Sequence, residues 1–194
     1  YQYSDFTKDQ NGNLILNPNL PKPSVNVYPG DCMYADLNGD NVVDGNDRMT
    51  TGYAERPEYV FGLNAGFNYK GFNFSMQWSG ATNVNKMLQI EYRIPFTNAG
   101  KRGLLKYFYE DCWTPENQLA AKYPRAAETS ETWNSENSTL WLRDASYIRL
   151  KTISVGYTFS KKRFLKAIGA NTLGLSLSGY NLLTFSPLDI MDPE

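Results

Sequence analysis

Histidine is absent from this chain of 194 residues, and its absence removes several kinds of catalytic and regulatory site. Ser-His-Asp and Cys-His nucleophile systems, HExxH zinc sites and histidine pH switches all need an imidazole. A pair of carboxylates can still act as acid and base in glycoside hydrolysis, but no stretch singles out two acids for that role. We therefore expect no enzyme activity, and a carboxylate-dependent glycoside hydrolase ranks last among the functions weighed below.

Long apolar runs and an excess of charge of either sign are absent as well. No run reaches about 18 apolar residues, the length that suggests a transmembrane helix, and the mean hydropathy is -0.51. The net charge of -1 gives no reason to expect a nucleic acid partner. The chain opens with "YQYSDFTKDQ", without a Met or a signal segment, which predicts a mature protein or an excised piece.

Cysteine is scarce. The two cysteines, Cys32 and Cys112, lie far apart and show none of the close spacings of zinc or redox sites. A disulfide in an oxidising compartment and a pair of unrelated free thiols both stay open.

Aromatic residues and glycine are abundant, with 14 Tyr, 10 Phe, 4 Trp and 15 Gly, and they favour β structure. Strict apolar–polar alternation begins at Tyr59 and resumes in the same phase after Lys70-Gly71. A two-residue turn there would place apolar residues opposite one another. The predicted pairs are Tyr69 with Phe72, Phe67 with Phe74, Ala65 with Met76, and Leu63 with Trp78. Lys is not the usual first residue of a type I′ turn, so the hairpin is better defined than its turn type.

Alternation returns in "YIRLKTISVGYTF" at 147–159 and in "TLGLSLSGYNLL" from Thr172. The sequence therefore predicts four long strands and no core helix. Residues 81–146 lose this period, and a connection of such length is usually a functional loop. Residues 1–30 are rich in Asn and Pro and are expected to be extended and irregular.

Two architectures fit the strands: a soluble β-sandwich and a transmembrane β-barrel. The polar faces hold Gly, Asn, Ser and Gln almost without charge, and aromatic residues lie near the strand ends, as in outer-membrane barrels. Strands of about ten residues suit a tilted bilayer span. Short connections at 70–71 and 160–171 would lie on one side, with the long ones on the other. Four strands cannot close a barrel, and open edges are not tolerated in lipid, so this pattern predicts more chain.

Five blocks of sequence, taken in order, resemble the C-terminal third of the barrel of SusC/RagA-type TonB-dependent outer-membrane transporters. They are "PGDCMYADLNGDNVVDGNDR", "YVFGLNAGFNYKGFNFSMQWSG", "DCWTPENQLAAKYPRA", "WLRDASYIRLKTISVGYTFSKK" and "LSLSGYNLLTFSPLDIMDPE". The resemblance implies a barrel of about 22 strands with a plug, a SusD-like surface lipoprotein as cap, energy from the TonB complex, and oligosaccharide or peptide cargo. This chain would be a fragment in contact with outer-membrane lipid, and it would not form a closed barrel alone.

We divide the chain on that basis. Residues 1–58 are expected to be an extracellular segment with a calcium-type loop at 36–47, and residues 59–80 a transmembrane hairpin. Residues 81–146 would be a long extracellular loop, and residues 147–182 two further barrel strands with a short periplasmic connection. Residues 183–194 would begin another extracellular loop, cut short at Glu194.

The loop at 36–47 matches the calcium ligand pattern of an EF-hand. The candidate ligands, in the order of ligand positions 1, 3, 5, 7, 9 and 12, are Asp36, Asn38, Asp40, the carbonyl of Val42, Asp44 and Asp47. Calcium binds several hard oxygens, which a loop of this kind supplies. The alternative is an Asx-rich turn closed by its own hydrogen bonds. Helices do not flank the loop, so we expect a structural calcium and not a regulatory switch.

The long loop contains an aromatic group: Tyr107, Tyr109, Trp113, Tyr123, Trp133 and Trp141. These side chains could stack on sugars or contact peptides, but a loop of this size must bury something, so we favour a small core. Four basic residues, Lys161, Lys162, Arg163 and Lys166, are expected to form a solvated turn, with lipid phosphate or a periplasmic partner as the alternative.

Arg149 and Lys151 share the phase of the apolar face of their strand, so we expect that end of the strand to lie above the hydrocarbon. The leading function is import of glycan or peptide fragments across the outer membrane of a Gram-negative bacterium. The second is a secreted, calcium-stabilised β-sandwich that binds carbohydrate.

Overall fold

The computed structural model describes residues 1–96, 101–127, 132–160, 165 and 167–194. The chain divides into two compact units. Unit 1 comprises Tyr1–Thr51 and Met87–Leu142, and unit 2 comprises Gly52–Lys86 and Arg143–Glu194. The predicted basic turn, Lys161, Lys162, Arg163 and Lys166, lies outside the described residues.

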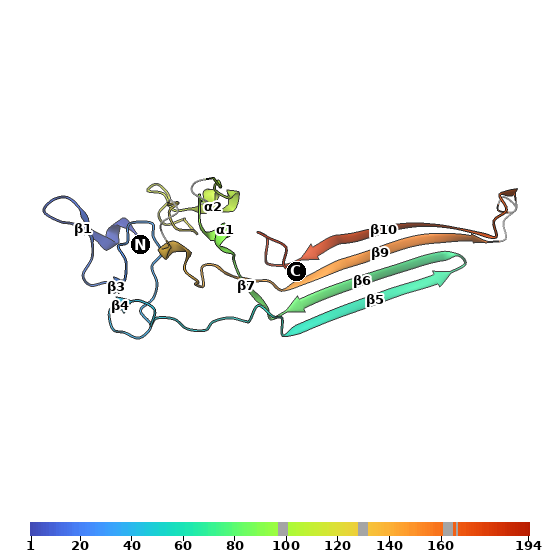
Figure 1. Cartoon of the computed structure of the whole chain (residues 1–194), viewed down its shortest axis with the longest axis horizontal. Helices are drawn as coiled ribbons and strands as arrows, with labels where there is room; N and C mark the ends of the chain where they lie inside the picture. Colours follow the sequence, from blue (N-terminus) through green and yellow to red (C-terminus); the bar gives the residue numbers. More distant parts are fainter. Residues whose placement is uncertain (97–100, 128–131, 161–164, 166) are drawn as a thin grey trace. The chain divides into compact units, whose positions relative to one another are not determined.

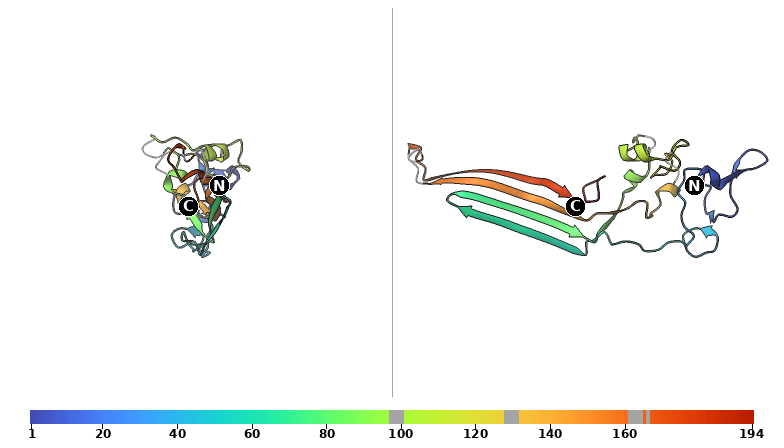
Figure 2. Two further views of the ribbon diagram at one scale, coloured as in Figure 1. Left: turned by 90° about the vertical axis from the view of Figure 1, so that its right-hand side faces the viewer. Right: turned by 180° about the vertical axis from the view of Figure 1, so that it is seen from behind.

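Unit 2 is built on one antiparallel sheet of four strands. The strands are β5 (Tyr59–Tyr69), β6 (Phe72–Thr82), β9 (Tyr147–Ser160) and β10 (Thr172–Phe185), and the sheet order is β10-β9-β6-β5. Figure 1 and the rear view in Figure 2 both show the four strands side by side. The four predicted strands are confirmed, although β6 continues past residue 80 and β10 continues past residue 182.

The β5–β6 hairpin has the predicted register at all four apolar pairs. Lys70 and Gly71 both have positive φ, at 48° and 91°, which is the signature of a type I′ turn. The turn is tied to the next strand as well, because the Thr158 N–H donates to the Gly71 carbonyl at 2.7 Å. Alternation and turn position together thus determine which residues meet across the hairpin.

The registers of β6, β9 and β10 align residues of the same kind across all four strands, so each face of the sheet has one character. Cross-strand rows on one face are apolar: Tyr69, Phe72, Tyr157 and Leu175 form one, and Phe67, Phe74, Val155 and Leu177 form the next. Rows on the opposite face are small and polar: Asn68, Asn73, Gly156 and Ser176, then Gly66, Ser75, Ser154 and Ser178. We call these the apolar face and the polar face.

A bulge in β9 corrects one prediction. The register shifts between Gln77, which pairs with Thr152, and Trp78, which pairs with Leu150. Lys151 is the extra residue, so beyond it the strand changes phase. Leu150 therefore joins Trp78 on the apolar face. Arg149 pairs with Ser79 on the polar face, and the expectation that Arg149 shares the apolar face was wrong.

Unit 1 is made of short elements around aromatic side chains. They are η1 (Tyr3–Asp5), β1 (Phe6–Lys8), β2 (Leu14–Leu16), β3 (Lys22–Pro23), β4 (Val42–Val43), α1 (Ile90–Arg93), α2 (Lys106–Asp111) and η2 (Trp133–Ser135). A further short pair, β7 (Asn85–Met87) with β8 (Leu142–Asp144), forms where the chain passes between the units. None of the helices in the described part of the chain has the length and hydrophobicity to cross a membrane.

The core of unit 1 is a stack of rings from the long loop. Phe108, Tyr123 and Trp141 lie nearly parallel, with centroids 5.6 to 6.3 Å apart. Trp141 is fully buried, and Trp113 is buried too, whereas Tyr109 is 69% exposed. The predicted core is therefore confirmed for the tryptophans at 113 and 141 and wrong for Tyr109.

Beside the rings, a buried carboxylate ties distant segments together. Asp31 accepts hydrogen bonds from the Arg125 Nε (2.6 Å), the Asn134 side chain (2.8 Å) and the Tyr28 backbone N–H (2.8 Å). A buried carboxylate is tolerated only when it is paired and hydrogen-bonded in this way. Asp31 thus holds the N-terminal segment and the long loop in one unit.

Candidate functional site

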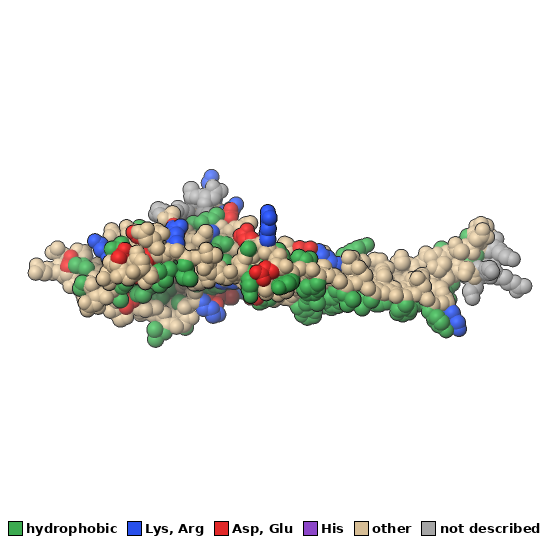
Figure 3. Space-filling view, turned by 90° about the horizontal axis from the view of Figure 1, so that it is seen from below, with side chains coloured by type: hydrophobic (Ala, Val, Ile, Leu, Met, Phe, Trp, Pro, Cys, Tyr) green, Lys and Arg blue, Asp and Glu red, His purple; other side chains and the backbone are tan. Residues whose placement is uncertain are grey.

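The apolar face of the sheet is the largest functional candidate, because it is uncovered. Leu177 is 80% exposed, Leu175 60%, Leu63 58% and Phe67 55%. Figure 3 shows hydrophobic side chains gathered along one side of the sheet. Such a continuous apolar surface marks contact with protein or lipid. No second sheet among the described residues lies over it, as the inner face of a sandwich requires.

Side chains on the polar face form hydrogen bonds with one another. Between the turn and Gln77, the cross-strand rows of this face contain no charged residue. Asn73 donates from its amide to the Thr158 hydroxyl at 3.2 Å, and the Ser178 hydroxyl lies 2.9 Å from that of Ser154. Because the side chains are small, this face has a hollow of about 490 Å³, lined in part by Gly66, Gly156 and Ser176. Such a surface suits water or a polar segment.

The sheet also has two open edges in the part of the chain that the structure describes. β5 pairs only with β6, and β10 pairs only with β9. An open edge exposes unpaired N–H and C=O groups and is a site for pairing with further strands. An exposed apolar face can enter lipid only if such edges are closed by additional strands.

The acidic loop at 36–47 is held by hydrogen bonds from its own backbone. The Asp36 carboxylate accepts the N–H groups of Gly39 (2.6 Å) and Asn41 (2.8 Å), and Asp40 accepts that of Val42 (2.8 Å). Gly39 and Asn41 take left-handed conformations, with φ of 78° and 64°, which Gly and Asn tolerate best. These are the bonds of the predicted Asx-rich turn.

Asp47 closes the loop from its far end. Its carboxylate accepts the N–H groups of Leu37 (2.7 Å) and Asp44 (2.8 Å), which are ten and three residues away in the chain. Hydrogen bonds, first from the Asp44 N–H, hold the Asp47 pKa below its usual range. Val42, whose carbonyl was a predicted ligand, lies in β4, which pairs in parallel with β3.

The structure therefore brings the two ends of the predicted calcium loop together through Asp47, whose carboxylate accepts the N–H group of Leu37. In the described residues no three carboxylates or thiols converge as a ready metal site. The donor set still includes the amide oxygen of Asn38 and a backbone carbonyl, which are ordinary calcium ligands. Hydrogen-bonded carboxylates and a loop of this length are compatible with calcium, which remains a prediction.

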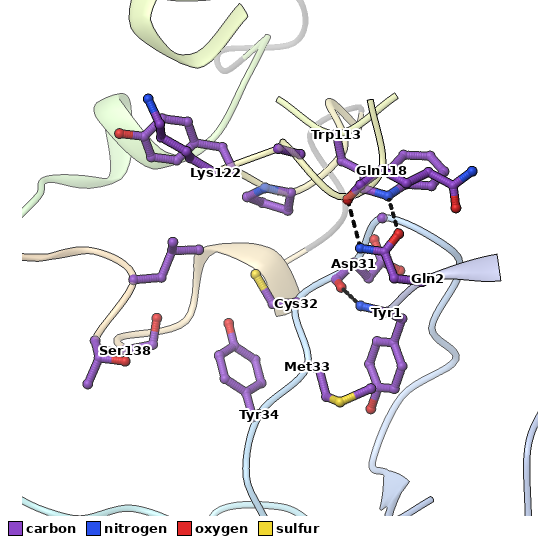
Figure 4. Close-up of a pocket in the computed structure, with 16 residues that line it drawn as sticks. Tyr1, Gln2, Asp31, Cys32, Met33, Tyr34, Trp113, Gln118, Lys122 and Ser138 are labelled. Carbon is purple, nitrogen blue, oxygen red and sulfur yellow. Dashed lines mark hydrogen bonds between the residues drawn. The ribbon is translucent and has the colours of Figure 1, made fainter. Parts of the chain in front are cut away.

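Unit 1 contains a cavity of about 270 Å³ beside the cysteine at 32 (Figure 4). Two of its polar side chains hold the fold together. The Trp113 indole donates to the Gln2 side chain, and Gln2 donates to the Gln118 carbonyl, both at 2.9 Å. Sequence reasoning missed the cavity because its walls come from four separate stretches with no shared motif.

Both cysteines are free thiols in the structure. Burial raises the pKa of Cys32 to about 11, so this thiol stays protonated at neutral pH. The Tyr34 hydroxyl lies nearby and donates to the Trp133 carbonyl at 2.7 Å. Cys32 is thus not an activated thiol, and of the two alternatives for the cysteines the structure shows the free thiols.

Comparisons with known proteins agree with the fold. No family model matches the chain. TonB-dependent receptor P26 of Formosa agariphila is 33% identical over 167 residues, which are 85% of this chain and 16% of the receptor. TonB-dependent receptor P3 of the same organism is 29% identical over 86% of this chain. The chain therefore spans about one-sixth of the length of these curated relatives.

Solved structures give the same picture for the fold. The RagAB peptide importer in its open-open state matches with a TM-score of 0.59 at 18% identity, covering 79% of this chain and 16% of that one. Its closed-closed state also matches with a TM-score of 0.59, at 15% identity, and covers 96% of this chain. The fold of this chain is thus similar to that of one segment of the RagAB importer, which makes up 16 to 18% of that chain.

Proposed function

We propose that this chain, as a barrel segment of a SusC/RagA-type TonB-dependent receptor, belongs to an outer-membrane nutrient importer. In that importer it would form part of the barrel wall and of the outer loops. The observation that carries the proposal is the sheet of unit 2, whose apolar face is exposed and whose edges are open. Further strands would close these edges, and lipid would cover the apolar face. The polar face would then line the lumen.

The strand connections support one orientation. The tight turn at Lys70-Gly71 would lie in the periplasm, because barrels of this class have short periplasmic turns and long outer loops. The long loop and the acidic loop, both in unit 1, would then be extracellular. We propose this orientation on the connection lengths alone.

The similar proteins support a proposal for partners and cargo. One class of structural neighbour is a peptide importer by name, and we propose that this protein takes up peptide or glycan fragments. A SusD-like lipoprotein would cap it from outside, and the TonB complex would energise it. No covalent chemistry is proposed, in keeping with relatives named as receptors.

Membrane extraction tests the proposal. The complete gene product, expressed in a Gram-negative host, is expected in the outer-membrane fraction, to resist extraction by urea and carbonate, and to need detergent for solubility. A product that is soluble without detergent would favour the secreted β-sandwich instead and would overturn the importer.

We further propose that the acidic loop binds one structural calcium ion. In titration calorimetry of the detergent-solubilised complete product, we expect one site that Asp36→Asn with Asp47→Asn abolishes, because both carboxylates are predicted ligands and both hold the backbone of the loop. Asp9→Asn is the matched control, since Asp9 also accepts backbone N–H groups in an exposed turn outside the loop. No calcium heat in the unchanged protein, or equal heat in the double variant, would refute the site.

A further inference from the structure

The segment after β10, Ser186–Glu194, folds back over the polar face of its own sheet, and we call it the strap. Figure 1 shows the chain turning at the end of β10 and ending beside β9. Leu188 is buried against Ala81, Val84 and Ala145. The Ser186 hydroxyl donates to the Ser146 carbonyl at 2.8 Å. The strap is therefore packed against the sheet.

The strap ends on a cluster of opposite charges. Arg149 donates from Nη2 to Asp192 and from Nη1 to Glu194, the latter at 2.9 Å, and Lys151 pairs with Glu194. The Arg149 guanidinium also lies over the Tyr147 ring, 5.6 Å from its centroid. The cations belong to the sheet, whereas both carboxylates belong to the strap.

Burial differs sharply between the two sides of this cluster. The Arg149 side chain is 6% exposed, but the side chains of Asp192 and Glu194 are 64% and 40% exposed. A buried guanidinium needs an anion, and removing one would leave a costly unpaired charge. The exposed carboxylates, in contrast, lose little when they return to water. Breaking these ion pairs would therefore cost Arg149 more free energy than it would cost the two carboxylates of the strap.

Two polar atoms beneath the strap are left without partners. Arg149 Nε and Ser79 Oγ are buried and have no hydrogen-bond partner among the described residues. The two residues pair directly across β6 and β9 and so share the polar face. Unsatisfied buried groups of this kind cost free energy. The strap carboxylates therefore use only part of the hydrogen-bonding capacity of this position.

We infer that Arg149, Lys151 and Ser79 form a binding site for an external carboxylate, and that Asp192 and Glu194 occupy it in cis. Displacement of the strap would free a guanidinium fork, an ammonium and a hydroxyl on one face. A guanidinium binds a carboxylate through two parallel hydrogen bonds, which the two separate strap carboxylates do not provide. The ligand class is a carboxylate carried by a small acid or by an acidic peptide side chain.

The inference goes beyond the proposed importer, and its test does not depend on transport. The strap competes at an effective concentration on the order of millimolar or above, so we expect weak binding in the unchanged protein. The test variant is Asp192→Asn with Glu194→Gln in the detergent-solubilised complete gene product. It keeps the strap in shape but removes both competing charges.

Two probes separate the sources of the carboxylate: glutarate, and an acetylated and amidated tripeptide of Ala, Glu and Ala. We expect the double variant to bind at least one of them at least about tenfold more tightly than the unchanged protein, as one charged hydrogen bond provides. Adding Arg149→Met to the double variant should abolish that gain. Binding of glutarate alone would identify a free acid, and binding of the peptide alone a peptide side chain.

A second measurement on the unchanged protein covers the case of a misfolded variant. Amide hydrogen exchange in the strap should speed up in glutarate but not in sodium chloride of equal ionic strength. Equal exchange in the two salts, or a double variant that binds neither probe more tightly, would overturn the inference.

Discussion

Gly71, at the tip of the β5–β6 hairpin, shows how one residue fixes the turn. It has φ of 91°, and a Cβ there would lie 2.6 Å from the Thr158 carbonyl oxygen. Both the backbone conformation and the space therefore require glycine. The neighbouring Lys70 also has positive φ but projects from the turn, where its ammonium lies 5.1 Å from the centroid of the Tyr69 ring.

Gly71→Ala should therefore destabilise the protein. We expect a loss of about 3 kcal/mol in the free energy of unfolding, from a left-handed alanine and a backbone clash together. Gly169→Ala is the matched control, because Gly169 has φ of 69° with nothing within 4 Å of its Cβ position, and it should lose about 1 kcal/mol. Urea titration of the detergent-solubilised complete product measures both, and equal losses would show that the contact with Thr158 has no effect.

The Asp47 carboxylate makes the stability of its loop depend on pH. Its pKa is lowered from 3.8 in the folded loop, so its stabilising effect is complete above the unfolded value and is lost as the pH falls through the folded value. We expect the hydrogen-exchange protection of the Asp44 amide to fall below about pH 4. Asp47→Asn should remove that pH dependence, and protection that persists unchanged in acid would contradict this role.

At the scale of elements, the strands were predictable because their pattern is local. Odd positions from Phe61 to Tyr69 are apolar, even positions are small, and the turn residues fall where the phase repeats. Register follows from those two facts alone. Burial of Trp141 in a small core was also predicted, but its stacking on Phe108 and Tyr123 was not, because these rings come from distant, aperiodic sequence.

The bulge at Lys151 shows where the pattern misleads. Arg149 and Lys151 continue the odd phase of Ile153 and Val155, so period alone places them on the apolar face. A bulge this close to the end of a strand cannot be recognised from the alternation, because too few residues follow it to show the change of phase. The consequence is functional, since the bulge moves Arg149 to the polar face and under the strap. The acidic loop was found from its spacing, but its hydrogen bonds required the structure.

A positive charge should destabilise the protein more on the apolar face of β10 than on its polar face. Leu177→Arg places a cation on the exposed apolar face, and in lipid it should cost about 3 kcal/mol. Ser176→Arg, on the polar face of the same strand, should cost less than about 1 kcal/mol. Folding into liposomes followed by urea titration measures the difference. Equal costs, or a higher cost at Ser176, would show that the apolar face does not meet lipid.

At the scale of the whole molecule, the chain contains a sheet with open edges in its described part and a large irregular unit that has its own core. The sheet needs further strands and a bilayer, whereas unit 1 buries Trp141 and Phe108 by itself. The aligned part of this chain covers only 16% of each relative. We therefore expect strands outside the described residues to close the barrel.

The most direct test of this account is a nitroxide scan along β5 in the complete product reconstituted in liposomes. Labels are attached singly at residues 63–69 in a background with Cys32→Ser and Cys112→Ser. We predict a period of two, with Leu63, Ala65, Phe67 and Tyr69 accessible to lipid-soluble oxygen, and Asn64, Gly66 and Asn68 accessible to a water-soluble nickel complex. Uniform access of the nickel complex to all seven positions, or the reverse phase, would contradict a lipid-facing apolar surface.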